Sequence, residues 1–488
     1  MKIKFDIKKF ILVIIAALAF AGVLYVNNNV LIISFEQLLY GVMKLKGSGT
    51  STVLYGVIYV LMSFILICPI LLLPVVDFGK KFVINIRNKS FQLYPIKHIK
   101  TYGILLLVLS VICLLYLFEF FPFVKNVIFS NTNLFDDYYV DSSDVEVTFP
   151  KQKRNLIYIF VESLESSNIS TKNGGLFEES IVPNLEQLAI DNVNFSNNDK
   201  IGGAHYSYGT NWTAAAMIAQ TSGVPLKVTL DDFGPNSIRF NNVTSIGDIL
   251  ADNGYNNYLL LGSDASFGSR RAYFANHNYL IKDYVSAIED GKIDSDYYEW
   301  WGYEDAKLFS YAKEMLLDIS QDDEPFNLTM LTADTHFTDG YLDKSCDSKF
   351  DEPYSNSFYC SDKMVNEFID WIKEQDFYDN TTIVIVGDHL TMQDGFYETD
   401  DYSERTIYNT FINVKVDGKY NNKNRIFTVM DMFPTTLAAI GADIEGDRLG
   451  LGTNLFSDKE TVPEILGIDE FNDEITKGSY YYYNYIRK

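Results

Sequence analysis

Two strand-like runs of the sequence end in side chains that bind divalent metal ions. Asn155–Val161 is followed by Glu162, and Thr382–Val386 is followed, after one glycine, by Asp388 and His389. Two carboxylates and one imidazole suit manganese, magnesium or zinc. Taken alone, an Asp-His pair is more often a cap or a hydrogen-bonded turn. Because a parallel sheet brings its strand ends together at one edge, the two motifs together predict a metal site there.

A hydroxyl group is the next chemical feature of the sequence. The segment Gly209–Met217 is a turn that enters an Ala-rich helix, with Thr213 at the start of the helix. Thr213 can be a helix N-cap, a position that its residue type favours. The same geometry suits a nucleophile, because helix N–H groups stabilise an anion and a metal ion lowers the pKa of a hydroxyl. Ser207 and Thr210, in the loop before the helix, are alternative hydroxyls.

Basic side chains follow two further strand-like runs. His336 comes shortly after Asn327–Leu331, and Arg270 and Arg271 follow Tyr258–Leu261 after a short loop. A histidine at such a position binds substrate in some enzymes and is only a buried hydrogen-bonding group in many other proteins. An adjacent arginine pair in an acidic domain predicts either a fork that grips phosphate or a surface ion pair.

These residues need a scaffold that gathers strand ends, and residues 153–456 have the pattern of one. The apolar runs alternate with helical patterns at Gly302–Leu317, Ser361–Gln375 and Met432–Ile440. Strands that are apolar on both faces and separated by helices predict an α/β domain with a mainly parallel sheet sandwiched by helices.

Residues 1–125 have the composition of a membrane anchor. Three apolar stretches are close to the roughly 20 residues that a spanning helix needs: Phe10–Val26, Val53–Val76 and Tyr102–Val124. Lys and Arg gather before the first stretch and between the second and third, which predicts a cytoplasmic N-terminus and an outer domain after the third span. The shorter apolar segment Val30–Met43 predicts an interfacial helix, with a re-entrant segment as the alternative.

The charge of the chain agrees with this division. Residues 1–125 carry 13 Lys and Arg against 4 Asp and Glu, whereas residues 126–488 carry 27 against 60. The total of −24 argues against a nucleic-acid partner, which needs a basic surface. The polar, acidic stretch 126–152 predicts a linker, and residues 457–488 predict a C-terminal extension of the outer domain.

The two cysteines of the outer part, Cys346 and Cys360, lie 14 positions apart. In an oxidising compartment such an isolated pair predicts a disulfide. A zinc site is the weaker alternative, because no C-x-x-C or C…H-x-x-x-H spacing lies nearby.

In their order, these motifs resemble the sulfatase-like enzymes of the alkaline phosphatase superfamily. The resemblance rests on Asn155–Ser163, Gly209–Met217, Asp334–Phe337 and Val386–His389. More narrowly, the sequence is similar to the membrane phosphoglycerol transferases and lipoteichoic acid synthases of bacterial envelopes, whose closing motif resembles Arg448–Leu455. The resemblance implies an alkaline phosphatase-like fold for the outer domain.

The resemblance also implies a role for each site residue. It implies one divalent metal ion, foremost manganese with magnesium or zinc as alternatives, bound by Glu162, Asp388, His389 and the nucleophile Thr213. It further implies that His336 and Arg270 contact the transferred phosphoglycerol.

One departure from the family pattern narrows the chemistry. The sulfatase signature, a Cys or Ser followed by x-Pro-Ser-Arg, is absent, because Thr213 precedes three alanines. This counts against hydrolysis of sulfate esters.

The activity implied by the resemblance is transfer of glycerol phosphate from phosphatidylglycerol to a hydroxyl of an extracytoplasmic glycan or teichoic-type polymer, through a phospho-threonine intermediate. A phosphoethanolamine transferase of the same superfamily is one alternative, and a catalytically inactive anchored binding or sensor protein is another. The implied location is the cell membrane, crossed several times, with the catalytic domain periplasmic or extracellular and in contact with membrane lipid.

Overall fold

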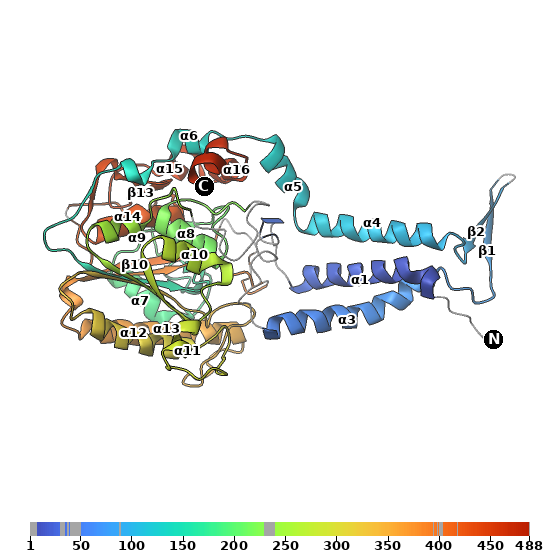
Figure 1. Ribbon diagram of the computed structural model, residues 1–488, viewed down its shortest axis with the longest axis horizontal. Coiled ribbons are helices and arrows are strands. Elements are labelled where there is room, and N and C mark those ends of the chain that lie inside the picture. Colours follow the sequence, from blue (N-terminus) through green and yellow to red (C-terminus); the bar gives the residue numbers. More distant parts are fainter. Residues whose placement is uncertain are drawn as a thin grey trace. The chain divides into compact units, whose positions relative to one another are not determined.

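The computed structural model describes residues 7–29, 35–36, 39, 50–86, 89–228, 240–393, 395–397, 399, 404–416 and 418–487 (Figure 1). The chain forms two compact units, one of residues 1–38 and 48–125 and the other of residues 39–47 and 126–488. Most of the segment Val30–Met43, predicted as an interfacial helix, lies outside the described residues.

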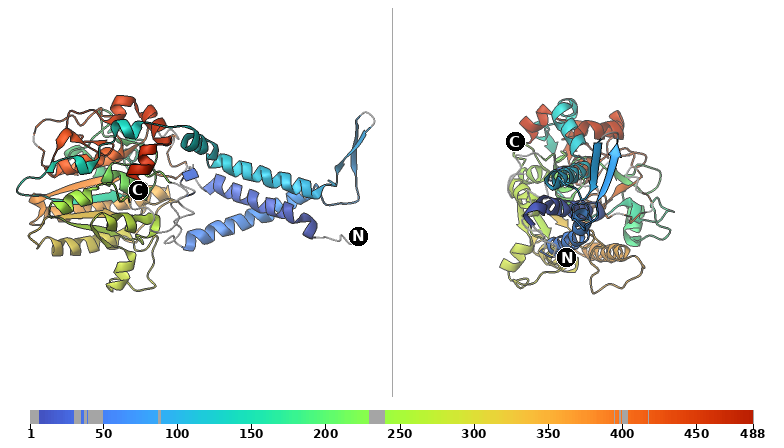
Figure 2. Two further views of the ribbon diagram at one scale, coloured as in Figure 1. Left: turned by 45° about the horizontal axis from the view of Figure 1, so that its top comes forward. Right: turned by 90° about the vertical axis from the view of Figure 1, so that its right-hand side faces the viewer.

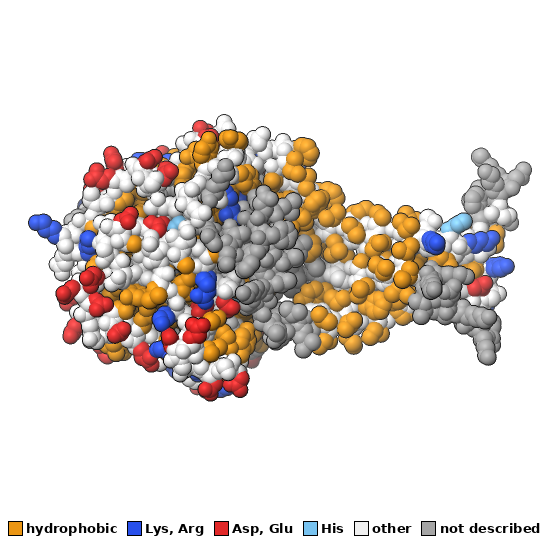
Figure 3. Space-filling view, viewed as in Figure 1, with side chains coloured by type: hydrophobic (Ala, Val, Ile, Leu, Met, Phe, Trp, Pro, Cys, Tyr) orange, Lys and Arg blue, Asp and Glu red, His pale blue; other side chains and the backbone are white. Residues whose placement is uncertain are grey.

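The described residues of the first unit include three long apolar helices and one hairpin. The helices are α1 (Ile7–Asn29), α3 (Thr50–Leu72) and α4 (Ile99–Leu117), and the hairpin is β1 (Phe82–Ile86) with β2 (Lys89–Tyr94). Helix α1 packs against both other helices (Figure 2). A Cβ on Gly103 of α4 would lie 2.7 Å from Cβ of Leu12, so only glycine allows this close approach to α1. Elsewhere the helices present apolar side chains outward (Figure 3).

One helix among the described residues, α4, is long and apolar enough to cross a membrane. Helices α1 and α3 contain the shorter apolar stretches Phe10–Tyr25 and Gly56–Leu72. The predicted third stretch, Tyr102–Val124, differs from the structure at its end. Helix α4 stops at Leu117, Glu119 takes a left-handed φ of 53°, and a separate short helix α5 (Phe120–Val124) follows.

A seven-stranded sheet is the centre of the second unit, and it confirms the predicted α/β fold. Its strand order is β5-β10-β9-β4-β8-β6-β7. The strands from β9 to β7 are parallel, and β10 runs antiparallel to both of its neighbours. The bounds are β4 Asn155–Val161, β5 Gly203–His205, β6 Asn256–Leu261, β7 Tyr279–Lys282, β8 Phe326–Leu331, β9 Thr381–Gly387 and β10 Thr406–Ile412.

Helices cover both faces of this sheet (Figure 1). Strand β4 supplies Phe160 to one buried cluster and its neighbour Ile159 to the other, because successive side chains of a strand point to opposite faces. Fully burying one such side chain contributes about 1.5–3 kcal/mol. One face is covered by α8 (Thr213–Ser222), α9 (Ile246–Asp252), α10 (Arg270–Asn276) and α14 (Met432–Ala439). The other is covered by α7 (Pro183–Asp191), α11 (Tyr284–Glu289), α12 (Asp305–Ile319) and α13 (Pro353–Lys373).

The segments before and after the sheet pack together on the second unit. Residues 126–152 contain α6 (Leu134–Tyr138) and β3 (Val147–Thr148), which pairs with β11 (Asp443–Ile444). The C-terminal segment contains α15 (Val462–Leu466) and α16 (Ile468–Thr476), preceded by the small hairpin β12 (Arg448–Leu449) and β13 (Gly452–Thr453). The rings of Phe135 and Tyr482, 5.0 Å apart, join the two segments.

Cys346 and Cys360 form the predicted disulfide, with their Cα atoms 5.7 Å apart. Acidic side chains are scattered over the visible face of the second unit (Figure 3), as its composition predicts.

Candidate active site

Sheet register brings the two metal-ligating motifs together. Strands β4 and β9 are parallel neighbours, with Val161 paired to Gly387. Glu162 and Asp388 each follow one of these residues, so both leave the sheet at its carboxyl edge side by side. A Cβ on Gly387 would lie 1.9 Å from the Leu164 carbonyl oxygen, so glycine is required there.

The three predicted ligands form one buried cluster. Ligand atoms of Glu162, Asp388 and His389 lie within 4.8 Å of one another. His389 Nε2 is 3.3 Å from Glu162 Oε1 and 3.3 Å from Asp388 Oδ2. The side chains of all three residues are almost completely buried. The close packing of two carboxylates and one imidazole is the donor set of a divalent-cation site.

Hydrogen bonds leave the ligand atoms free to point at one centre. His389 Nδ1 donates to the Leu390 carbonyl at 2.8 Å, so Nε2 carries the lone pair whenever the ring is neutral. Asp388 Oδ1 accepts from the backbone N–H groups of Ser163 and His389. Asp388 Oδ2, in contrast, is buried and has no hydrogen-bond partner among the described residues. A buried carboxylate oxygen without a partner is costly, and a cation bound there would satisfy it, so the residues fit a metal ion.

Electrostatics couple these groups. Burial would raise the pKa of Glu162, but the hydrogen bond and charge of His389 outweigh it and lower that pKa to about 2. Burial would lower the pKa of His389, but the charges of Asp388 and Glu162 raise it to about 10. Burial, together with the charge of Glu162, raises the pKa of Asp388 to about 7. Without a cation the cluster therefore holds a proton on His389 in neutral solution.

Thr213 points into this cluster. Its hydroxyl donates to Glu162 Oε2 at 3.1 Å and lies 3.5 Å from His389 Nε2. The N-cap alternative is wrong, because Trp212 occupies the cap position of α8 and Thr213 is the first helical residue. The alternative hydroxyls, Ser207 and Thr210, bond to each other at 3.1 Å instead.

Gln220 fixes α8 against the strand that carries two of the ligands, and the sequence analysis missed it. Its amide Nε2 donates to the Gly387 carbonyl at 3.0 Å, and its Oε1 accepts from the Tyr158 hydroxyl at 2.7 Å. Gln220 is fully buried and lies seven residues after Thr213, two helical turns along. A polar residue at that spacing in an otherwise Ala-rich helix was the available signal.

Ser163, also missed, has a left-handed φ of 56° although it is fully buried. This conformation lets its N–H reach Asp388 Oδ1 at 2.7 Å and its hydroxyl reach Glu162 Oε1 at 3.1 Å. Such backbone strain is typical of functional sites, where the surrounding contacts maintain it.

His336 and Arg270 lie near the cluster. His336 Nδ1 donates to the Phe337 carbonyl at 2.6 Å. Burial lowers the pKa of His336 against the opposing charge of Glu162, and the charges of His389 and Arg270 add to the lowering. Arg270 is buried and donates to Ser263 and to two carbonyls, whereas Arg271 forms an ion pair with Asp283. The two arginines are therefore distinct: the charge of Arg270 acts on His336, whereas Arg271 is engaged by Asp283.

A pair of buried carboxylates holds the loop that carries His336. Asp305, at the start of α12, accepts from the N–H groups of Ala333 and Asp334 at 2.8 and 3.0 Å. Asp334 in turn accepts from the N–H of Asp305 at 3.2 Å. Burial raises the pKa of Asp305 to about 7 and that of Asp334 well above its usual range. Asp334 opens the motif Asp334–Phe337, whereas Asp305 stands in no recognisable spacing, so the sequence gave no signal for the pair.

A buried ion pair supports the loop after His389. Glu165 accepts from Arg405 through both carboxylate oxygens and from the N–H of Thr391 at 2.8 Å. Neither charged group is exposed by more than 5%. Glu165 and Arg405 are 240 residues apart in the sequence, so only the folded sheet shows their pairing.

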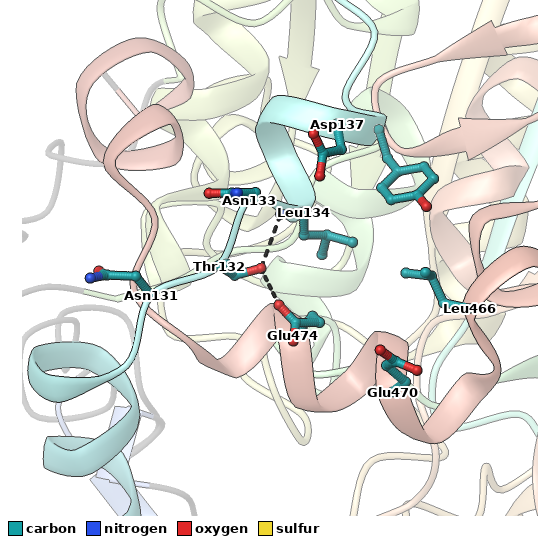
Figure 4. Close-up of a pocket in the computed structure, with 9 residues that line it drawn as sticks. Asn131, Thr132, Asn133, Leu134, Asp137, Leu466, Glu470 and Glu474 are labelled. Carbon is teal, nitrogen blue, oxygen red and sulfur yellow. Dashed lines mark hydrogen bonds between the residues drawn. The ribbon is translucent and has the colours of Figure 1, made fainter.

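A cavity of 370 Å³ lies elsewhere on the second unit (Figure 4). Figure 4 shows Thr132 between the N–H of Leu134 and the Glu474 carboxylate, both of which it bonds. The lining includes Asp137, Glu470 and Glu474 and none of the predicted site residues. An acidic lining disfavours an anionic phosphate ester, so the chemistry belongs to the cluster around Glu162.

The sequence and the fold were compared with known proteins. The family model described as Sulfatase matches residues 154–442, more than half of the chain. This chain belongs to the sulfatase family. Phosphoglycerol transferase I of Xanthomonas campestris pv. campestris (strain B100) is 32% identical over 257 residues, 50% of this chain and 35% of that protein. The match thus spans about a third of that curated relative.

Two solved structures of this family's fold are similar to the chain. The lipoteichoic acid synthase LtaP from Listeria monocytogenes is 18% identical, with a TM-score of 0.51 over 65% of this chain and 80% of that one. The integral membrane protein lipooligosaccharide phosphoethanolamine transferase A (EptA) from Neisseria meningitidis is 14% identical, with a TM-score of 0.51 over 89% and 83%. At these identities the similarity establishes the fold.

Proposed function

We propose that this protein is a membrane-anchored transferase that moves glycerol phosphate from phosphatidylglycerol to a hydroxyl of an extracytoplasmic glycan or teichoic-type polymer. The observation that carries the proposal is the contact of the Thr213 hydroxyl with Glu162 and His389, beside the unpartnered oxygen of Asp388. The relative named phosphoglycerol transferase I supports the choice of donor.

Glu162, Asp388 and His389 would hold one divalent ion, foremost Mn²⁺, which would offset phosphate charge and make the neighbouring hydroxyl more acidic. Thr213 supplies the attacking oxygen, and Glu162 accepts its hydrogen and orients it. Because Nδ1 of neutral His336 donates to a carbonyl, its Nε2 is left to accept a proton. Arg270 supplies a buried positive charge on the same side, suited to a phosphate oxygen.

The transfer proceeds in two displacements. Thr213 Oγ1 gives up its proton and bonds to phosphorus as the bond from phosphorus to the diacylglycerol oxygen breaks, and diacylglycerol leaves with that proton. The acceptor hydroxyl then gives its proton to His336 Nε2 and bonds to phosphorus, and the displaced Thr213 oxygen takes the proton back from His336. Two in-line displacements retain the configuration at phosphorus.

The membrane part of the proposal is a three-span anchor with a cytoplasmic N-terminus and an outer catalytic domain. Helix α4 is long and apolar enough to span, and the basic residues between the second and third stretches support the orientation. Anchoring suits the chemistry because the donor and the diacylglycerol product are both lipids.

Substitution of the nucleophile tests the mechanism. In membranes supplied with glycerol-labelled phosphatidylglycerol, Thr213→Ala should abolish diacylglycerol release, whereas Thr213→Ser should keep part of it. Elemental analysis should find the metal retained in both variants, since the three other ligands remain. Near-normal turnover by Thr213→Ala, or the absence of a glycerol phosphate adduct on the peptide containing Thr213 of the wild-type protein, would refute the mechanism.

The donor headgroup is tested separately, because the fold is shared with EptA. Equal amounts of labelled phosphatidylglycerol and phosphatidylethanolamine should yield diacylglycerol from phosphatidylglycerol alone. Consumption of phosphatidylethanolamine instead would establish the phosphoethanolamine transferase.

A further inference from the structure

The chain that leaves the last apolar helix is tied to the C-terminal segment. The N–H of Gly478 bonds to the carbonyls of Asn126 and Ser130, each at 3.1 Å, and the N–H of Thr132 bonds to the Gly478 carbonyl at 2.9 Å. A side-chain bond from Asn126 to Thr476 adds to these contacts. Residues 476–478 are therefore fixed beside residues 126–132, directly after the apolar helical stretch Phe120–Phe129.

Both segments carry large apolar side chains that nothing in the second unit covers. Ile128 and Phe129 are 64% and 78% exposed, and Tyr480 and Tyr485 are 74% and 55% exposed. The rings of Tyr480 and Tyr485 lie 6.2 Å apart. We call these four residues the Tyr480 surface. Exposed aromatic side chains grouped in this way usually mark an interaction site.

The charges around the Tyr480 surface limit its partner. Carboxylates, first Asp141 and then Asp136 and Asp144, add to the effect of burial in raising the pKa of Tyr481, whose ring lies 5.1 Å from that of Tyr485. These carboxylates disfavour an acidic partner. The two basic residues that flank the tyrosines are already engaged, Lys477 by Asp473 and Glu474 and Arg487 by the ring of Phe240. The surface is suited to a partner that accepts aromatic rings and phenol hydroxyls without requiring charge.

From this position and composition we propose that the Tyr480 surface is a membrane-contact site that rests in the interfacial region of the bilayer. Tyrosine is enriched at that depth because its ring is apolar and its hydroxyl remains hydrated. The backbone bonds to Gly478 hold the start of the tyrosine segment beside residues 126–132, the chain at the end of the apolar helical stretch Phe120–Phe129. The proposal rests on the membrane anchoring proposed above and is independent of the donor and of Thr213.

A fluorescent label on the surface tests the contact without any turnover. The background is the full-length protein with Cys68→Ala and Cys113→Ala, which removes both free cysteines. One variant of it carries Tyr480→Cys for labelling, and the control variant carries Ile190→Cys. Ile190 lies on α7 and is 51% exposed. In uncharged phosphatidylcholine nanodiscs, a polarity-sensitive label at Tyr480 should emit at shorter wavelength and be quenched by brominated lipid, whereas a label at Ile190 should not. Equal quenching at both positions, or quenching that requires anionic lipid, would overturn the proposal.

A kinetic comparison asks what the contact does. The double variant Tyr480→Asp, Tyr485→Asp should slow diacylglycerol release from lipid bilayers roughly tenfold. This is the loss expected when two rings that rest in the lipid interface are replaced by charged groups. Hydrolysis of a water-soluble phosphodiester should stay within twofold of wild type, and Ile190→Asp should change neither rate. Unchanged release from bilayers, or an equal loss on both substrates, contradicts the proposal. If the label at position 480 contacts lipid but the protein releases no diacylglycerol, the proposed function is refuted and the membrane-contact site is not.

Discussion

Replacing Gln220 should loosen helix α8, which carries Thr213. Gln220→Leu removes the partners of two fully buried groups, the Tyr158 hydroxyl and the Gly387 carbonyl. Each buried polar group left unpaired costs about 1–3 kcal/mol, so the variant should lose about 2–6 kcal/mol of local stability. The lost stability is that of the contact between α8 and β9, the strand that ends in Gly387. The distance from the Thr213 hydroxyl to Glu162 and His389 depends on that contact.

Hydrogen exchange in the intact protein measures this loss. Because a tenfold change corresponds to about 1.4 kcal/mol, the amides of α8 in Gln220→Leu should exchange at least about thirtyfold faster than in wild type. Ser222→Ala is the matched control, since the Ser222 hydroxyl bonds to Ile218 of the same helix and to Tyr273, but not to β9. It should lower the opening free energy of the α8 amides by less than about 1 kcal/mol, the usual net contribution of one hydrogen bond.

A second substitution separates the two lost bonds. Adding Tyr158→Phe to Gln220→Leu removes the orphaned hydroxyl and should restore about 1–3 kcal/mol of protection. If the exchange of α8 in Gln220→Leu stays within threefold of wild type, or if the double variant is no better protected than the single one, the reasoning about Gln220 fails.

Three further predictions concern charge, metal and the disulfide. Glu165→Ala leaves Arg405 buried without a carboxylate and should lower the free energy of unfolding by about 3–5 kcal/mol, read by chemical denaturation; a loss below 1 kcal/mol would contradict this. His389 must lose a proton of pKa about 10 to bind a cation, so metal affinity should rise about tenfold per pH unit from pH 7 to pH 10. Calorimetry can measure this rise, and an affinity that does not change with pH would argue against His389 as a ligand. Joint replacement of Cys346 and Cys360 by serine should cost about 3 kcal/mol, the chain-entropy value for so short a loop, and should make stability insensitive to reductant.

The strands that carry the site were predictable because they are apolar on both faces. Strand β4 has the predicted bounds, and β9 extends the predicted run by one residue at each end. Strand β10 was missed because it contains Asn409 and Thr410, which read as exposed. In the fold both are buried, and Asn409 bonds to the backbone of Phe195 in both directions. A polar strand of this kind becomes recognisable only when its distant partners are in place.

Helix boundaries and supporting residues were less predictable for related reasons. The predicted helix from Gly302 begins instead at Asp305, because Gly302 has a φ of 154° that no helix accepts. Helix α13 begins at Pro353, eight residues before the predicted start, and buries polar residues such as Asn356 that the sequence suggests are exposed. The six predicted site residues stood after strands, directly or beyond a short loop, or at a helix start, where sequence pattern is informative. Ser163 and Glu165 act through tertiary hydrogen bonds that no local pattern encodes, and Gln220 had only its spacing from Thr213 as a signal.

The separation of Glu162 and Asp388 along the chain has a consequence for how the protein matures. Ser163 and Asp388, which bond to each other at the cluster, are 225 residues apart, and the pairing of β4 with β9 is what closes that distance. Contacts of such long range form late in folding, because the loop between them must first lose its entropy. A fragment that lacks either strand cannot bring Glu162 and Asp388 together, so a cation held by these residues would bind only after β4 and β9 have paired. A cation bound there would then report on paired strands and could not nucleate their pairing.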